Sequence, residues 1–292
     1  MHKAMYPVER VRNDGPEVGD EPESARARCS LLGPLRISAR GAGPDDGVSV
    51  PPKIRTVLAM LCVHPDQVVP VPALMRELWC ERPPVSGLRT LQTYVLNARK
   101  LLSQAAACSP LEIAQDVLVT RAGGYSFQCS GIRLDWQDFK RLTERGRAAI
   151  RAGDSLGGSR LLEEALGLWQ GSAFSDVPAG PVLESRRLLL EESRLEAVEA
   201  LVEARIEAGL HQRVIAELAS LTSEHPLHEG LHGQYMRALA LNGRRAQALE
   251  VFSGLRARLV DEIGIEPGYP LQQLQLSILN SHTVEYAPLS VG

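Results

Sequence analysis

Hydrophobic residues in the first half of the chain change their spacing several times, which predicts a small domain of mixed strands and helices. Short β-prone runs at residues 29–32, 35–38 and 48–50 are broken by Gly and Pro, and we expect them to form a small antiparallel sheet. Apolar residues then recur at helical spacing over residues 53–63. A second helix is expected to begin at Pro72 and to end near Trp79.

A third helix, over residues 88–102 with Ser86 as its N-cap, is predicted to have two unlike faces. Its apolar face is formed by Leu91, Val95, Ala98 and Leu102. Its polar face carries Arg89, Gln92, Thr93, Leu96, Asn97, Arg99 and Lys100. The major groove of B-DNA admits one α-helix, and its base edges offer paired donors and acceptors. We therefore expect Arg89 to bind guanine and either Gln92 or Asn97 to pair with adenine. Thr93 and Leu96 are expected to contact thymine methyl groups, and Arg99 and Lys100 to bind phosphates.

Two β-prone runs, residues 117–121 and 125–128, flank a Gly-Gly pair and predict a hairpin directly after that helix. A basic helix face alone is equally consistent with a solvated surface. The order of elements favours DNA, because a hairpin after a basic third helix is placed as a wing, with Arg121 at its tip beside a phosphate. The fold class expected for residues 27–130 is an α+β winged helix-turn-helix.

From residue 135 onward the pattern is helical, and glycine recurs with similar neighbours. Gly153, Gly209 and Gly243 each lie between helical runs, and the last two are 34 residues apart, the period of tetratricopeptide repeats. Small or apolar residues follow each glycine at matching distances. Five residues on are Gly158, Val214 and Ala248; nine on are Leu162, Leu218 and Phe252; twelve on are Ala165, Leu221 and Leu255. Chance periodicity is the competing interpretation. We expect residues 131–292 to form an all-α domain of stacked tetratricopeptide-like helix pairs.

Charge is divided unequally along the chain, although the net charge is only −3. Residues 53–103 contain seven Lys and Arg against three acids, whereas residues 129–292 contain 17 against 22. This division is expected if only the first half binds phosphate. Residues 1–26 are polar, with six acids, five of them set among Gly and Pro from Asp14 to Glu23, and we expect a disordered leader or, alternatively, an interaction tail.

Several motifs in order resemble one family of bacterial regulators. Residues 53–61 (KIRTVLAML), 74–79 (LMRELW), 90–95 (TLQTYV), 99–101 (RKL) and 123–125 (GGY) look like the OmpR-type winged helix of the Streptomyces antibiotic regulatory proteins. Residues 166–171 (LGLWQG), 184–187 (ESRR), 225–227 (HPL) and 262–267 (EIGIEP) resemble the bacterial transcriptional activation domain of the same proteins.

The resemblance implies a pathway-specific activator of an antibiotic gene cluster, with residues 88–102 as the recognition helix. It further implies binding to promoter direct repeats by protomers that associate side by side on double-stranded DNA. A loop facing RNA polymerase is implied at Glu81, Arg82, Pro83, Pro84 and Val85. The family commonly has Ser-Arg-Leu at positions 96–98, where this chain has Leu-Asn-Ala, which predicts a different preferred sequence and a lower affinity.

Other functional classes find little support in the sequence. The five cysteines are scattered, which argues against disulfides or a zinc site and favours the reducing cytoplasm as the compartment. As a DNA-binding protein, it is expected to be associated with the nucleoid. No run is long enough to span a membrane, and no nucleotide-binding or catalytic signature occurs, so we expect neither a cofactor nor an enzyme. His225, His228 and His232 are interpreted as solvated or capping residues rather than metal ligands. The alternative function is a repeat scaffold whose N-terminal domain binds protein instead of DNA.

Overall fold

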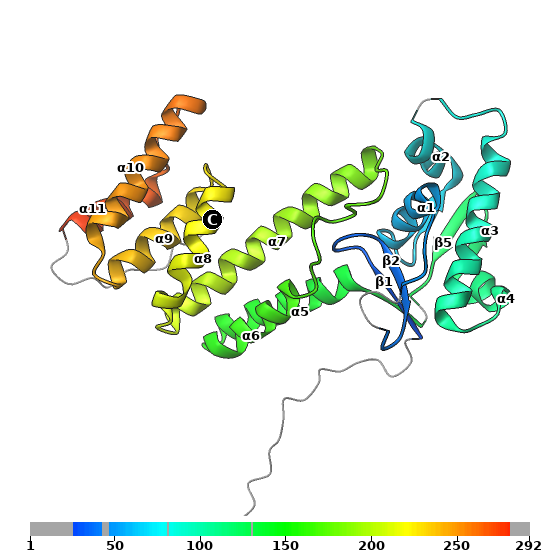
Figure 1. The fold of residues 1–292 in the computed structure, drawn as a ribbon, viewed down its shortest axis with the longest axis horizontal. Helices are drawn as coiled ribbons and strands as arrows, with labels where there is room; N and C mark the ends of the chain where they lie inside the picture. Colours follow the sequence, from blue (N-terminus) through cyan, green and yellow to red (C-terminus); the bar gives the residue numbers. More distant parts are fainter. Residues whose placement is uncertain (1–25, 43–46, 81, 130, 281–292) are drawn as a thin grey trace, which may run out of the picture.

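A computed structural model describes residues 26–42, 47–80, 82–129 and 131–280 (Figure 1). Its first sheet joins β1 (Ala27–Ser30) to β2 (Arg36–Ala39) in antiparallel fashion and to β6 (Ile132–Leu134) in parallel fashion. The expected antiparallel pairing is confirmed for the first two runs, but the sheet also contains a parallel strand, β6, about a hundred residues later in the chain. Residues 48–50 form no strand, although the Val48 amide donates to the Ile37 carbonyl at 2.9 Å. The leader expected at residues 1–26 lies outside the described residues, apart from Arg26.

The three predicted helices of the first half are confirmed as α1 (Pro52–Cys62), α2 (Val71–Trp79) and α3 (Gly87–Ala106). The third continues four residues beyond the predicted end at residue 102, because Ala105 and Ala106 extend its buried stripe. Ser86 occupies the predicted N-cap position of α3, but it makes no side-chain capping bond there. Its hydroxyl lies 3.5 Å from that of Thr90.

The predicted hairpin is confirmed as β4 (Leu118–Arg121) and β5 (Gly124–Phe127), and it belongs to a second three-stranded sheet. The third member, β3 (Val68–Pro70), pairs antiparallel with β5 and was not expected from the sequence. Two short turns, α4 (Pro110–Glu112) and η1 (Ile113–Val117), connect α3 to the hairpin. A side chain at position 124 would overlap the backbone of Val69, so glycine permits the close approach of β5 to β3.

The second half is helical, as expected. It contains α5 (Asp135–Arg151), α6 (Ser155–Leu166), α7 (Pro181–Glu207), α8 (His211–Glu224), α9 (Glu229–Leu241), α10 (Arg245–Glu262) and α11 (Tyr269–Asn280). Gly153, Gly209 and Gly243 end α5, α7 and α9 with φ of +89°, +77° and +74°, which glycine adopts without strain. Leu162, Leu218 and Phe252 are buried at matching places, which confirms the helix-pair repeat.

One hydrophobic core extends across both halves of the molecule. It begins at Ala27 in β1, passes through α1 and α3, and continues into α5, α6 and α7 as far as Leu201. We call residues 26–134 the winged half and residues 135–280 the helical half. In Figure 1, α5 and the start of α7 lie against the winged half. The two halves are therefore packed together and not merely tethered.

Candidate nucleic-acid interface

The recognition helix predicted from the sequence presents a continuous exposed stripe on α3. Arg89, Gln92, Thr93, Leu96 and Lys100 are all exposed, and their spacing of three and four residues places them along one line of the helix. The opposite face of α3 is fully buried. Its residues, each no more than 1% exposed, are Leu91, Val95, Ala98 and Leu102. Leu96 keeps half of its side chain in solvent at 50% exposure. A helix held this firmly on one side can present its other side to a groove without changing shape.

Asn97 and Arg99 lie on the two flanks of that stripe and are half-buried. The Arg99 guanidinium reaches the wing: Nε and Nη2 donate to the Leu118 carbonyl at 2.9 and 2.7 Å, and Nη2 also donates to Thr120 Oγ1 at 2.8 Å. Partial burial lowers the pKa of Arg99, and the Tyr125 phenol opposes this effect. The predicted phosphate ligand is thus also the contact that holds β4 against α3.

The wing ends at a tight turn beside the N-terminus of α2. Arg121, the last residue of β4, is exposed, and Ala122 and Gly123 make the turn, with Gly123 at φ +78°. The Gly123 carbonyl accepts a hydrogen bond from the Val71 amide at 3.0 Å. Because β5 pairs with β3 and the turn bonds to α2, the cationic tip is held in a defined place relative to α3.

The loop between α2 and α3 projects from the winged half (Figure 1). Arg82, Pro83, Pro84 and Val85 are exposed, and Val85 has no part of its side chain covered. Glu81, the remaining residue expected to face polymerase, lies outside the described residues. Val85 and the two prolines before it form an exposed apolar tip, and exposed apolar surface of this kind is typical of protein contacts.

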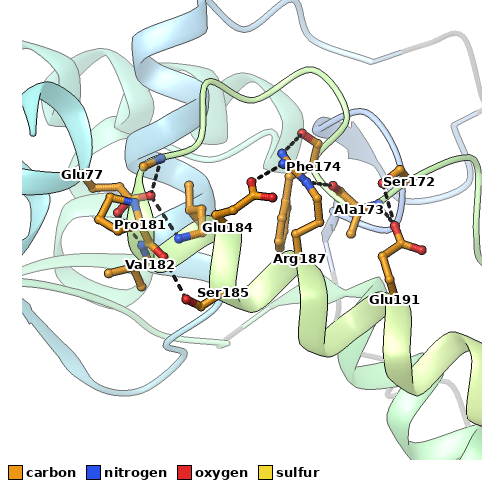
Figure 2. Close-up of polar contacts among 12 residues, drawn as sticks. Glu77, Ser172, Ala173, Phe174, Pro181, Val182, Glu184, Ser185, Arg187 and Glu191 are labelled. Carbon is orange, nitrogen blue, oxygen red and sulfur yellow. Dashed lines mark hydrogen bonds and ion pairs between the residues drawn. The ribbon is translucent and has the colours of Figure 1, made fainter. Parts of the chain in front are cut away.

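A buried carboxylate joins α2, the helix leading into this loop, to the helical half. Glu77 is 4% exposed, and Figure 2 shows it at the first turn of α7. It accepts hydrogen bonds from the backbone amides of Gly180 at 2.7 Å and of Val182 and Leu183 at 3.0 Å. These amides have no partner within their own helix, and the helix dipole favours a negative charge at this end. Glu77 therefore caps α7 from another domain.

The segment between α6 and α7 is fastened on both sides of this cap. Asp176 forms an ion pair with Arg55 of α1 at 3.0 Å and accepts a hydrogen bond from the Leu35 amide at 2.7 Å. Thr56 of α1 donates to the Pro178 carbonyl at 2.9 Å.

The same segment is also bound to α7 itself (Figure 2). Arg187 donates to the carbonyls of Ala173 and Phe174. Glu191 accepts hydrogen bonds from Ser172 and Ala173. These contacts fix the direction of α7 relative to the winged half.

Asp135 fastens the start of α5 to the first sheet in a similar way. Its carboxylate is 1% exposed and accepts from the Leu31 amide at 2.8 Å and from the Leu32 amide at 3.0 Å. Burial raises the pKa of Asp135 to about 6, although the hydrogen bonds from Leu32 and Leu31 pull it downward. This carboxyl group links the stability of the junction to pH.

Comparisons with known proteins agree with this arrangement. Residues 45–127 match the family of the C-terminal domain of transcriptional regulatory proteins, and residues 134–279 match the bacterial transcriptional activator domain. Regulatory protein DnrI of Streptomyces peucetius is 42% identical over 257 residues, which cover 87% of this chain and 92% of DnrI. The chain belongs to the Streptomyces antibiotic regulatory protein family. It is a DNA-binding transcriptional activator with an OmpR-type winged helix.

Longer regulators contain the same pair of domains. Regulatory protein AfsR of Streptomyces griseus is 34% identical over 93% of this chain, which spans only 26% of AfsR. The solved structure of Mycobacterium tuberculosis EmbR in complex with a low-affinity phosphopeptide is 34% identical and superposes with a TM-score of 0.80. That likeness covers 87% of this chain and 65% of the EmbR chain. The fold of both halves is thus common to this regulator and EmbR.

Sequence reasoning missed the residues that join the two halves of this regulator. Glu77 lies between Leu74 and Leu78 on the buried face of α2, and a carboxylate on an apolar helix face was a readable signal of a buried partner. Asp135 and Asp176 gave no comparable signal, because their amide partners at residues 31, 32 and 35 are distant in the chain.

Two of the three histidines considered as metal ligands have structural roles. His228 caps α9 by accepting from the Leu231 amide at 3.3 Å, which confirms the capping interpretation, whereas His232 is only 3% exposed and is not solvated. In the part of the chain that the structure describes, no three His, Cys, Asp or Glu residues are grouped to hold a metal ion. Within the same ranges, no helix is long and apolar enough to cross a membrane.

Proposed function

We propose that this protein activates one antibiotic biosynthesis gene cluster by binding direct repeats beside a promoter. In this proposal residues 27–130 bind DNA, and residues 131–292 control activation. The observation that carries the proposal is the exposed stripe of α3, which lies opposite a fully buried stripe and combines base-reading with phosphate-binding side chains.

Each residue of the interface has a proposed partner on the duplex. Arg89 binds guanine, Gln92 or Asn97 pairs with adenine, and Thr93 and Leu96 contact thymine methyl groups. Lys100 and the wing residue Arg121 bind phosphates on either side of the groove. Arg99 binds phosphate with the part of its guanidinium that faces away from Leu118, and it positions the wing at the same time.

Activation is proposed to proceed through the loop between α2 and α3. Protomers bound side by side on adjacent repeats would turn Glu81, Arg82, Pro83, Pro84 and Val85 toward RNA polymerase. The exposed apolar tip at Val85 supports this role. The site of action is the nucleoid in the cytoplasm.

Arg89→Ala tests the recognition stripe most directly. The operator is first located by footprinting the promoter nearest the protein's own gene, and affinity is then measured by gel shift. Loss of a bidentate contact to guanine removes roughly 1–3 kcal/mol, so we expect a weakening of about tenfold or more. Arg160→Ala on α6, which removes the same charge from an exposed position outside the winged half, serves as the control. Equal affinity of the two variants would refute the assignment of α3.

Salt dependence separates this function from a protein-binding scaffold. Binding that neutralises several phosphates releases counterions, so affinity for the operator should fall steeply as salt concentration rises. Lys100→Ala should reduce the slope by about one unit on the double-logarithmic plot. A complex that is insensitive to salt would favour the scaffold.

A further inference from the structure

A groove between α5 and α7 is not used by either proposed interface. It has a volume of about 340 Å³, which lies within the range of cavities that bind small organic molecules. Trp136 and Phe139 of α5 form one wall, Leu189 and Leu190 of α7 form the other, and Val63 at the end of α1 closes one side. An occupant would therefore contact the winged half and the helical half at once.

One polar atom in this groove is buried without a partner. Thr56, Thr93 and Thr222 also lie in helices, and each donates its hydroxyl to the carbonyl four residues earlier. The Thr143 residue is 7% exposed, yet its Oγ1 forms no hydrogen bond with any residue that the structure describes. Buried hydroxyls in folded proteins are nearly always paired, so this atom points to a polar group supplied from outside the chain.

The charges around the groove leave an excess of one cation. Lys140 pairs with Glu144 at 3.9 Å, and Arg147 pairs with Glu196 at 3.0 Å. Arg186 also lines the groove and is exposed, and it forms no ion pair with the described residues. A guanidinium next to an apolar cleft favours a molecule that carries a negative charge on an apolar body.

The apolar part of the lining favours a flat occupant. Leu189 is 60% exposed although it faces the groove, and the half-buried indole of Trp136 also lines it. Phe139 is only 2% exposed and adds little surface. Aromatic and leucine side chains in a cleft gain free energy when an apolar ring removes them from water.

We propose that this groove is a binding site for a small aromatic anion. The ring of the ligand lies between the α5 and α7 walls, its anionic group pairs with Arg186, and Thr143 Oγ1 donates to an oxygen of the ligand. This site is separate from the DNA-binding stripe, and it gives the regulator a place to receive a chemical signal at the junction of its two halves.

The test uses the full chain without DNA, so that its result does not depend on the proposed function. The probe is anilinonaphthalene sulfonate, an aromatic sulfonate whose fluorescence rises in apolar surroundings, and stoichiometry is measured by calorimetry. We expect saturable binding of one probe per chain. Leu189→Asp places a carboxylate in the groove and should weaken binding roughly tenfold through charge repulsion.

Leu188→Asp is the matched control, because Leu188 is 65% exposed on the same helix and does not line the groove. It should leave affinity unchanged. Arg186→Gln, an exposed substitution that disturbs no packing, should weaken binding several-fold, whereas Arg160→Gln on α6 should not. Thr143→Val should raise the melting temperature of the free protein, because it removes the unpaired hydroxyl, and should weaken probe binding. Equal binding by the two aspartate variants, or binding that does not saturate at one per chain, would overturn the proposal.

Discussion

Replacing Glu77 by alanine tests how firmly the winged half holds the helical half. The carboxylate is 4% exposed and receives three backbone amides from Gly180, Val182 and Leu183. Removing it leaves these donors without their partner inside the junction.

The size of the effect follows from the contacts. Loss of an N-terminal cap commonly costs about 1 kcal/mol, and up to about 2 kcal/mol in proteins. Hydrogen bonds to a charged group contribute about 1.5–3 kcal/mol, and the contributions overlap because one carboxylate makes all of them. Relief from burying the charge offsets part of the loss. We therefore expect Glu77→Ala to lower the free energy of unfolding by about 3 kcal/mol.

Urea unfolding followed by tryptophan fluorescence measures this change, since Trp79 and Trp169 lie on either side of the junction. Glu77→Gln keeps one acceptor oxygen but brings an NH₂ group toward amide donors, so it should lose an intermediate amount. Glu192→Ala, on the exposed side of α7, should change stability by less than about 0.5 kcal/mol. If Glu77→Ala were no more destabilising than Glu192→Ala, the interdomain cap would have no energetic role.

Three further predictions concern other parts of the molecule. The pKa of Asp135 in the folded state, about 6, lies above its ordinary value of 3.8, so its ionisation disfavours the folded state as the pH rises through this window. Between about pH 4 and pH 7 the protein should lose roughly 3 kcal/mol of stability relative to Asp135→Asn, and parallel pH profiles from urea titrations would contradict this. Gly124→Ala should lower the melting temperature sharply, because its Cβ would overlap Val69, whereas Gly254→Ala in α10, which has open space, should raise it slightly. Arg99→Ala should speed amide hydrogen exchange in β4 and β5 and weaken DNA binding several-fold, since it leaves the Leu118 carbonyl unpaired; unchanged exchange would show that the wing is held by other contacts.

The local pattern of the sequence determined which side of each helix is buried. The stripe from Leu91 to Leu102 and the repeated positions after Gly153, Gly209 and Gly243 could be read directly, because helical periodicity is a property of neighbouring residues. The hairpin was equally readable, since turn glycines act locally. The winged half and the repeat half were therefore recognisable from the sequence alone.

Only the tertiary structure decided how these parts meet. The parallel pairing of β6 with β1, the cap of Glu77 on α7 and the contact of Arg99 with the wing each depend on which surfaces come together. The residues of the first two contacts lie about a hundred positions apart, so no local spacing encodes them. Their energy comes from satisfying buried backbone donors and acceptors, and these groups are buried only once the two halves have packed against each other.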